Sequence, residues 1–456
     1  MRRFPKLAAT LCALALAACG SETSLPEATG KASLRAINAI EASPEFVFLI
    51  EERGLDSVAY KQATSSASWD DLSYTFNFDV LFLGDLERTR VASMNLDLVA
   101  NKDYTFVISG AVAAPTITLW ETDIREWGET ETLTEFRFAH LAAAEGPVDI
   151  YLAAPGVAPV AGEEVGTLAF SEVLPALDLT AGEYVVTVTT AGDENDILFL
   201  SNSFTSAAAS SLLFSLFDGD ANDVAPLALR SFNTTSGGTA ALFDSRLSPT
   251  IRFFHASKDP AVDLVDVYIE DLLGMPAPAP LISSHAFEDI SGDISVPAET
   301  LPLAYTTAND IMTIHVQEEL TPAPGLRWNL VFVGGPGNPQ VFLGRTDRRS
   351  VETAAKISIL QTAANHDSVD LYVVDRGLDI SADEVNPVIT GIPPSGLPFS
   401  YQLLAGSYDF YLTTIGEKTV VTGPFEVDVV LGDIVELVVY DVDDTALAKM
   451  VAVPPP

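Results

Sequence analysis

The chain has 456 residues, with 24 Lys and Arg against 63 Asp and Glu, which gives a formal charge of -39. Hydrophobic residues make up 48% of the chain and charged residues only 19%, so it can bury a core and wholesale disorder is excluded. A surface this acidic repels phosphate, so no nucleic-acid partner is expected. The length allows about three or four domains of ~100–200 residues each.

The N-terminus predicts an export signal and a lipid anchor. Three basic residues precede an apolar run, 7–18, which is too short to span a ~30 Å hydrocarbon core as a helix. The run leads into LAAC at 16–19, which resembles the bacterial lipobox; the resemblance implies cleavage before Cys19 and lipidation of its thiol. The alternative is an ordinary secretory peptide with an incidental cysteine. The second cysteine, Cys12, lies in the segment to be removed, so no disulfide is expected in the mature chain.

The residues after the cleavage site indicate where the protein is held. Gly20 follows the cysteine, which resembles lipoproteins sorted to the outer membrane. We therefore predict a signal peptide at 1–18 and a lipidated, polar tether at 19–32. The expected location is the bacterial cell envelope, at the outer membrane, on its periplasmic face or at the cell surface. The membrane is a partner through Cys19, and a protein or polysaccharide partner is left open.

Four copies of one unit fill the rest of the chain. They begin at Leu34, Phe136, Ile251 and Ile357. Each has an apolar first strand that ends in a polar residue, and each closes with two strands joined by a turn, which is typical of a hairpin. A V-D-x-Y strand follows the first strand at 148–151, 265–268 and 369–372. The spacing of ~100 residues fits an independently folding domain rather than a solenoid repeat.

The strand patterns predict an all-β chain of four tandem immunoglobulin-like β-sandwich domains, each with about seven strands. Two A-G-x-Y turns, at 181–184 and 405–408, resemble the tyrosine corner of such sandwiches. The domains are predicted at 33–122 (a divergent copy), 134–233, 250–346 and 355–453. With the negative charge spread over four surfaces, we expect solvated domains that repel one another.

These features together resemble a bacterial family, the domain-of-unknown-function family four-three-nine-seven. The resemblance extends over nearly all of 34–451 and is strongest in copies two and four. Copy three has Leu303-Ala304-Tyr305 in place of the A-G-x-Y turn, and copy one lacks the Asp and Tyr of the V-D-x-Y strand. The resemblance implies a sandwich fold and a secreted or lipid-anchored location, and it implies no reaction.

The polar residue at the end of each first strand is the sharpest recurring feature. The four residues are Asn38, His140, His255 and Gln361. A repeated His could be a ligand or an acid–base group. Asn and Gln cannot replace His as a general base, but all three can hold a turn by hydrogen bonding. We therefore favour a structural role at this position.

The aspartates of the V-D-x-Y strands are a second candidate. They are Asp149, Asp266 and Asp370, and alternation places each on one face of its strand with the Tyr two residues later. Such a face could bind sugar. A solvated outer face of an antiparallel sheet is the more ordinary outcome, and we favour it.

Acidic and glycine-rich turns imitate ligand-binding loops. Residues 218–223, DGDAND, resemble the start of a calcium loop, but position six is Asp223 rather than Gly and position twelve is Leu229. Hairpin turn chemistry is favoured there and at 441–444. The run at 334–339 has no following Lys, so we interpret it as a turn and not as a phosphate loop.

No catalytic constellation is found, and no cofactor or metal is predicted. The remaining histidines, His285, His315 and His366, occupy non-equivalent positions and form no metal-ligand spacing. We predict a non-enzymatic, lipid-anchored envelope protein that acts as an interaction or spacer module. Two alternatives remain: a carbohydrate- or calcium-dependent binding module, and a hydrolase with an unrecognised pair of carboxylates.

Overall fold

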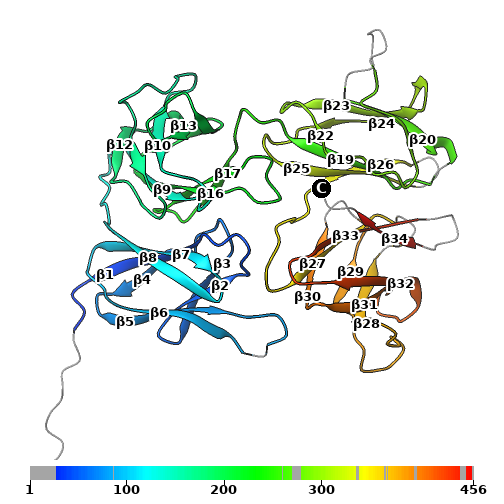
Figure 1. The fold of residues 1–456 in the computed structure, drawn as a ribbon, viewed down its shortest axis with the longest axis horizontal. Coiled ribbons are helices and arrows are strands. Elements are labelled where there is room, and N and C mark those ends of the chain that lie inside the picture. Colours follow the sequence, from blue (N-terminus) through cyan, green and yellow to red (C-terminus); the bar gives the residue numbers. More distant parts are fainter. Residues whose placement is uncertain are drawn as a thin grey trace, which may run out of the picture.

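The fold is known from a computed structural model that describes residues 27–85, 87–258, 260–269, 279–334, 338–363, 366, 368–394, 398–441 and 448–453. The predicted signal peptide and Cys19 lie outside the described residues. Apart from one 3-10 turn, η1 (Pro260–Val262), every regular element there is a strand (Figure 1). No helix in this part of the chain is long and apolar enough to cross a membrane.

The strands of the first half are arranged in two sandwiches. The first contains β1 (Lys31–Asn38), β2 (Phe46–Ile50), β3 (Arg53–Val58), β4 (Ala67–Asp70), β5 (Ser73–Val80), β6 (Thr89–Asp97), β7 (Lys102–Ala111) and β8 (Ala114–Asp123). The second contains β9 (Leu133–Leu141), β10 (Val148–Ala153), β11 (Gly166–Leu168), β12 (Leu177–Thr180), β13 (Glu183–Thr190), β14 (Ile197–Leu200), β15 (Phe204–Thr205), β16 (Ser210–Asp218), β17 (Leu227–Asn233) and β18 (Thr239–Leu242).

The second half repeats the arrangement. The third sandwich contains β19 (Thr250–His255), β20 (Leu264–Tyr268), β21 (Ile282–Ala286), β22 (Ile294–Ser295), β23 (Leu301–Thr307), β24 (Asp310–Leu320), β25 (Arg327–Val333) and β26 (Gln340–Gly344). The fourth contains β27 (Ala355–Gln361), β28 (Val369–Asp375), β29 (Ile389–Ile392), β30 (Phe399–Leu403), β31 (Gly406–Thr414), β32 (Val420–Val429), β33 (Ile434–Asp441) and β34 (Ala448–Val453).

All four sandwiches share one topology. In the first, one sheet has the order β4-β1-β7-β8 and the other β3-β2-β5-β6, and the same orders recur in the third and fourth. The first strand always pairs in parallel with the first strand of the closing hairpin, as β1 does with β7. We call the sheet with this pair the parallel-pair sheet and the other the hairpin sheet. The predicted all-β sandwich class is confirmed, with eight described strands in three copies where about seven were expected.

Each sandwich encloses its own core between the two sheets. In β9, Phe136 and Phe138 point into the core of the second sandwich, as the alternation of a strand requires. The intervening residues, Arg137 and Ala139, point out of the opposite face. In the first sandwich the core includes six aromatic side chains, and the ring centroids of Phe106 and Phe76 lie 4.6 Å apart.

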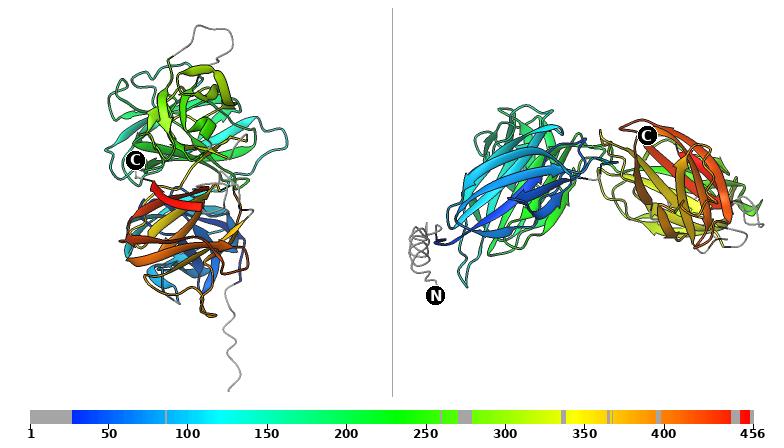
Figure 2. Two further views of the ribbon diagram at one scale, coloured as in Figure 1. Left: turned by 90° about the vertical axis from the view of Figure 1, so that its right-hand side faces the viewer. Right: turned by 90° about the horizontal axis from the view of Figure 1, so that it is seen from below.

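The sandwiches pack as two pairs, the first on the second and the third on the fourth (Figure 1). Seen from below, the pairs form two lobes joined at a narrow waist (Figure 2). Within each pair, apolar side chains from both parallel-pair sheets form one buried cluster. The expectation of separate, mutually repelling domains is therefore wrong. The apolar side chains on the outward faces of the parallel-pair sheets are buried in these clusters.

Candidate functional site

The polar residue that ends each first strand holds a turn, as favoured from the sequence. The side chains of Asn38, His140, His255 and Gln361 are all buried. Each accepts a hydrogen bond from the backbone N–H two residues later, at 2.8–3.3 Å. In the two histidines that acceptor is Nδ1, so Nε2 donates to a loop carbonyl, at 2.9 Å to Gly146 and 2.7 Å to Val262. An imidazole with both nitrogens engaged in this way is a structural group.

Burial also lowers the pKa values of two histidines in the third sandwich, His255 and His285. Burial lowers the pKa of His255 from 6.5 to about 4, although the carbonyl of Val262 opposes this shift. His285 lies beside it, with ring centroids 5.9 Å apart, and burial lowers its pKa as well. Repulsion between two adjacent imidazolium ions also disfavours protonation of both rings.

The aspartates of the V-D-x-Y strands are buried, which corrects the expectation of a solvated face. Each carboxylate accepts one hydrogen bond from the neighbouring edge strand and one from the turn that follows the strand on its other side. Asp370, for example, accepts the N–H of Gly391 and of Gly416, both at 2.8 Å. Both glycines have positive φ, at 68° and 71°. Asp266 binds Ser284 and Asn309 in the same way, and both of these also have positive φ.

Turns of this kind point backbone N–H groups inward, and the buried carboxylate satisfies them. In the second sandwich, Asp149 does this for Gly192 at 2.7 Å and also accepts the hydroxyl of Thr167 at 2.5 Å. The first sandwich has Val47 at this position, and the strand partner of Val47 is Asp79, whose carboxylate contacts Arg90 at 3.0 Å. The Asp–Tyr face is therefore no sugar-binding platform.

Both predicted tyrosine corners are confirmed. The hydroxyl of Tyr184 donates to the carbonyl of Thr180 at 2.6 Å, and that of Tyr408 donates to Leu404 at 3.2 Å. In the third sandwich, Tyr305 is fully buried and stacks on Phe332 with centroids 4.4 Å apart.

The calcium-like segment 218–223 is a turn, as favoured from the sequence, and its carboxylates bind a lysine. Lys61 of the first sandwich lies 3.1 Å from Asp220 and 2.5 Å from Asp223. The lysine is buried, so its ammonium ion fills the place that a cation would take. No group of three or more metal-ligating side chains forms among the described residues.

Other sequence candidates do not gather into a site. His315, on β24, hydrogen-bonds to Thr307 at 2.9 Å, and two strands separate β24 from β21, which carries His285. Gly334 adopts the positive φ of a turn, at 110°, while 335–337 lie outside the described residues. The acidic turn at 441–444 is described only at Asp441.

The turn at 218–223 and the residue after it also join the two pairs of sandwiches. The N–H of Val224 donates to Gly325 at 2.7 Å, and the amide of Asn222 donates to Asp347 at 3.0 Å. From the linker after the third sandwich, Arg349 donates to the carbonyls of Glu41 and Ser43, both at 2.7 Å. All four sandwiches or their linkers therefore meet at one polar centre.

Within each pair, equivalent positions make the interface. The outward residue just before the polar strand-end residue is apolar in every copy and lies in the interface: Ile37, Ala139, Phe254 and Leu360. Tyr60 packs edge-on against Phe217 in the first pair, with centroids 5.9 Å apart. Repeated use of one surface shows that pairing is a property of the unit.

The second pair fills the polar part of its interface with ions. Arg252 contacts Glu436 at 3.1 Å across the interface, and Arg348 contacts the same carboxylate at 3.3 Å. Burial lowers the pKa of Arg348, and the charge of Glu436 opposes that shift. A cavity of only about 20 Å³ remains beside Arg252 and Glu436.

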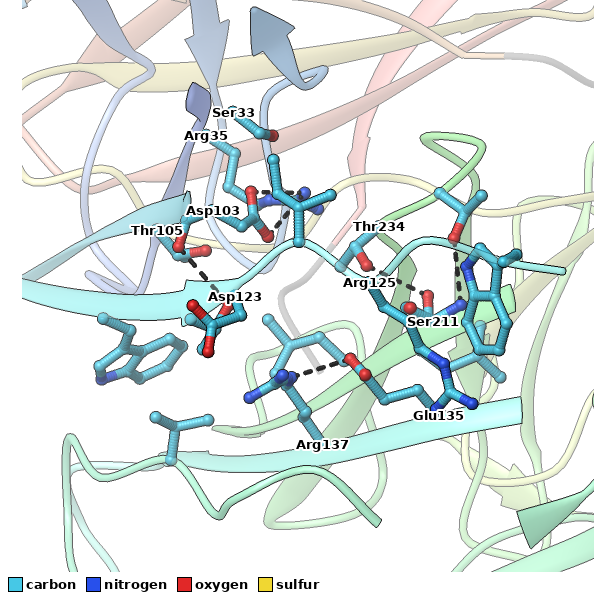
Figure 3. Close-up of a pocket in the computed structure, with 18 residues that line it drawn as sticks. Ser33, Arg35, Asp103, Thr105, Asp123, Arg125, Glu135, Arg137, Ser211 and Thr234 are labelled. Atoms are coloured by element: carbon cyan, nitrogen blue, oxygen red, sulfur yellow. Dashed lines mark hydrogen bonds and ion pairs between the residues drawn. The ribbon is translucent and has the colours of Figure 1, made fainter. Parts of the chain in front are cut away.

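The first pair leaves a pocket of about 240 Å³ at the corresponding place. One side carries Arg35 and Asp103, which lie 3.1 Å apart; the opposite side carries Arg137 and Glu135, also at 3.1 Å (Figure 3). The linker to the second sandwich contributes Arg125.

Indoles complete the wall of this pocket. Trp120 donates its Nε1 hydrogen to the carbonyl of Ser171 at 3.1 Å, which fixes the ring. Trp127 lies under the guanidinium of Arg125, whose carbon is 4.1 Å from the ring centroid. Sequence reasoning missed this site because it lies between two copies of the repeat, and within one copy its residues resemble a solvated sheet face.

The fold and its interfaces define a tandem β-sandwich protein with paired domains. Residues 32–151 match the family described as "Domain of unknown function (DUF4397)", so this stretch contains a domain of that family. The match covers the first sandwich and continues through β9 into β10.

Two solved structures show distant similarity to this chain. One match is the Bacillus anthracis TIE protein, at 10% identity and a TM-score of 0.15, covering 91% of this chain and 69% of that one. A second is a product complex of the pneumococcal glycogen-degrading virulence factor SpuA, at 6% identity and a TM-score of 0.15, covering 85% of this chain and 37% of that one. Comparison with curated proteins gives no match.

Proposed function

We propose that this chain is a non-enzymatic, lipid-anchored protein of the bacterial cell envelope, located at the outer membrane, whose four sandwiches form one compact interaction module. The observation that carries the proposal is the use of the recurring polar residues. The strand-end residues and the V-D-x-Y aspartates are all buried and hydrogen-bonded to the backbone of turns. Residues committed in this way are unsuited to acid–base or nucleophilic work.

The pairing of the sandwiches favours an interaction module over a flexible spacer. A spacer needs domains that move apart, whereas here each parallel-pair sheet is covered by another sandwich. Apart from the pocket of the first pair, the surfaces left for partners are the hairpin sheets and the loops, and the net negative charge of the chain disfavours anionic partners.

A calcium-dependent role gains no support from the turn at 218–223. Its carboxylates Asp220 and Asp223 are held by Lys61, and a cation would have to displace that buried ammonium group. Adding a chelator is therefore expected to leave the thermal unfolding temperature unchanged, and a clear decrease would revive the calcium alternative.

The anchor is tested by substitution at the two cysteines. Cys19→Ser should release the full-length protein from the membrane fraction, because the acyl-accepting thiol is lost. Cys12→Ser is the matched control and should leave membrane association unchanged. Membrane association of the Cys19→Ser variant equal to that of the control would overturn the anchoring proposal.

A further inference from the structure

We propose that the pocket between the first and second sandwiches binds one ring of a neutral saccharide. The inference is independent of the lipid anchor, because it concerns only the interface of the first pair. The two equivalent interfaces are filled unequally, with a pocket of about 240 Å³ in the first pair and a cavity of about 20 Å³ in the second.

Strand register identifies what closes the pocket in the second pair. β7 and β8 pair Thr105 with Trp120, and β25 and β26 pair Asn329 with Gly344. Counting four residues on from Trp120 and from Gly344, past the end of β26, makes Ile124 the sequence equivalent of Arg348, and Ile124 lines the pocket of the first pair.

The carboxylate partner is replaced as well. Parallel pairing sets Leu213 opposite Arg137 in the second sandwich and Glu436 opposite Ser358 in the fourth. Arg348 and Glu436, which fill the second interface, are thus Ile124 and Leu213 in the first. The first pair lacks the ion pair that would close it, and this leaves its cavity of about 240 Å³.

The lining of the pocket suits an uncharged polar ligand. Three arginines and three carboxylates line it, so their formal charges cancel. Arg35 and Arg137 each already hold a carboxylate, at 3.1 Å, and a free anion would have to compete with it. Hydroxyl groups of a neutral ligand can instead donate to the carboxylates and accept from the guanidinium groups.

The indoles add an apolar surface to this polar lining. Trp120 and Trp127 are two of the four tryptophans in the chain. A pyranose ring presents C–H groups on its faces and hydroxyls around its rim, which matches an indole wall with polar groups beside it. The volume is below the ~300–1,000 Å³ of pockets that hold drug-sized ligands, so one ring fits and a longer chain would extend outside.

The pocket is also held in shape before any ligand enters. Arg125, on the linker, contacts Glu131 at 3.4 Å and forms an ion pair with Asp178 of the second sandwich. These contacts keep the linker and Trp127 in position, which lowers the ordering cost of binding.

The test uses the purified full-length protein and four probes: the methyl glycosides of glucose, galactose, mannose and N-acetylglucosamine. Binding is measured by ligand-observed NMR and calorimetry. We expect at least one glycoside to bind at a single site. Ile124→Arg, which places a guanidinium where the second pair has Arg348, and Arg137→Ala should each weaken binding at least tenfold.

The control variant is Arg53→Ala, which removes an arginine from above another tryptophan, Trp69, outside the pocket. It should leave binding unchanged. Ile124 is 41% exposed, so its substitution should preserve the fold, as hydrogen exchange can verify. The proposal is overturned if no probe binds, if Ile124→Arg binds as well as the parent, or if methyl glucuronide binds more tightly than every neutral glycoside.

Discussion

The two interfaces of this protein are formed by equivalent sheets, but they accommodate their buried charged residues differently. In the second pair, Arg252 and Arg348 share the carboxylate of Glu436 in a nearly closed space. In the first pair, Arg35 and Arg137 take acidic partners from their own sandwiches, and a pocket stays open between them. Duplicated surfaces can thus keep their apolar contacts while the polar positions diverge toward closure or toward a cavity.

The largest expected effect comes from breaking the closed interface. Glu436→Ala removes the nearer of the two carboxylates that Arg252 and Arg348 share and leaves only Asp293, at 3.5 and 3.9 Å. We expect the second pair to lose about 3–4 kcal/mol of unfolding free energy. Urea dependence of amide hydrogen exchange in β27 and β33 measures it. Glu426→Ala, at an exposed carboxylate 3.7 Å from Arg376, is the control and should change little. A loss equal to the control's would show that Glu436 does not hold the interface.

The next effect is a pH dependence of the unfolding free energy, which His255 gives to the third sandwich and which Gln361 cannot give to the fourth. The pKa of His255 is about 4 when folded, against an ordinary 6.5, so below pH 6.5 the unfolded chain binds a proton that the folded chain refuses. Its contribution is complete above pH 6.5 and is lost as pH falls toward 4, by up to about 3 kcal/mol.

His255→Gln copies Gln361 of the partner sandwich and should remove this part of the pH dependence. Unfolding free energies at pH 7 and pH 4.5 measure the slope. His285 keeps its own lowered pKa in the variant and accounts for the slope that remains. Equal slopes in the parent and the variant would contradict the prediction.

A smaller effect is expected in the open interface. Asp103→Ala removes the partner of Arg35, but the pocket lets water reach the exposed atoms of the ion pair, so we expect a loss of about 1–2 kcal/mol. Hydrogen exchange in β1 and β7 measures it, with Asp123→Ala, at a mostly exposed carboxylate, as the control. A loss as large as that of Glu436→Ala would remove the distinction between the interfaces.

The smallest effect compares one tyrosine corner from each pair. Tyr184→Phe removes a hydrogen bond of 2.6 Å and should cost about 1 kcal/mol. Tyr408→Phe removes a longer one, of 3.2 Å, and should cost less. Urea unfolding of the two variants decides the order, and a larger loss from Tyr408→Phe would reverse it.

The repeat and its strands could be predicted because the signals are local. The V-D-x-Y strands, the A-G-x-Y turns and the closing hairpins each lie within a few residues of sequence. The burial of Asp149 could not be predicted in this way, because its partner Gly192 belongs to a turn 43 residues away.

The sequence does contain a sign of the pairing of sandwiches, namely adjacent apolar residues in the first strands, which an argument from strict apolar–polar alternation does not use. In Phe253-Phe254, adjacent residues are both apolar, so both faces of the strand need cover. The same holds for Ile359-Leu360 in the fourth copy. The pocket left no such signal, because the replacement of Arg348 and Glu436 by Ile124 and Leu213 becomes visible only when the copies are aligned through their strand register.

The polar centre also has a consequence for the order of assembly. Arg349 binds the carbonyl of Glu41, a contact between residues 308 positions apart in the chain, and Glu352 donates its N–H to Ala42. In a chain made from its N-terminus, the first pair of sandwiches can therefore form early, while the waist between the lobes closes only after residue 352 has emerged. Contacts of such sequence separation form late, so the waist should be the last part of the molecule to acquire its native structure.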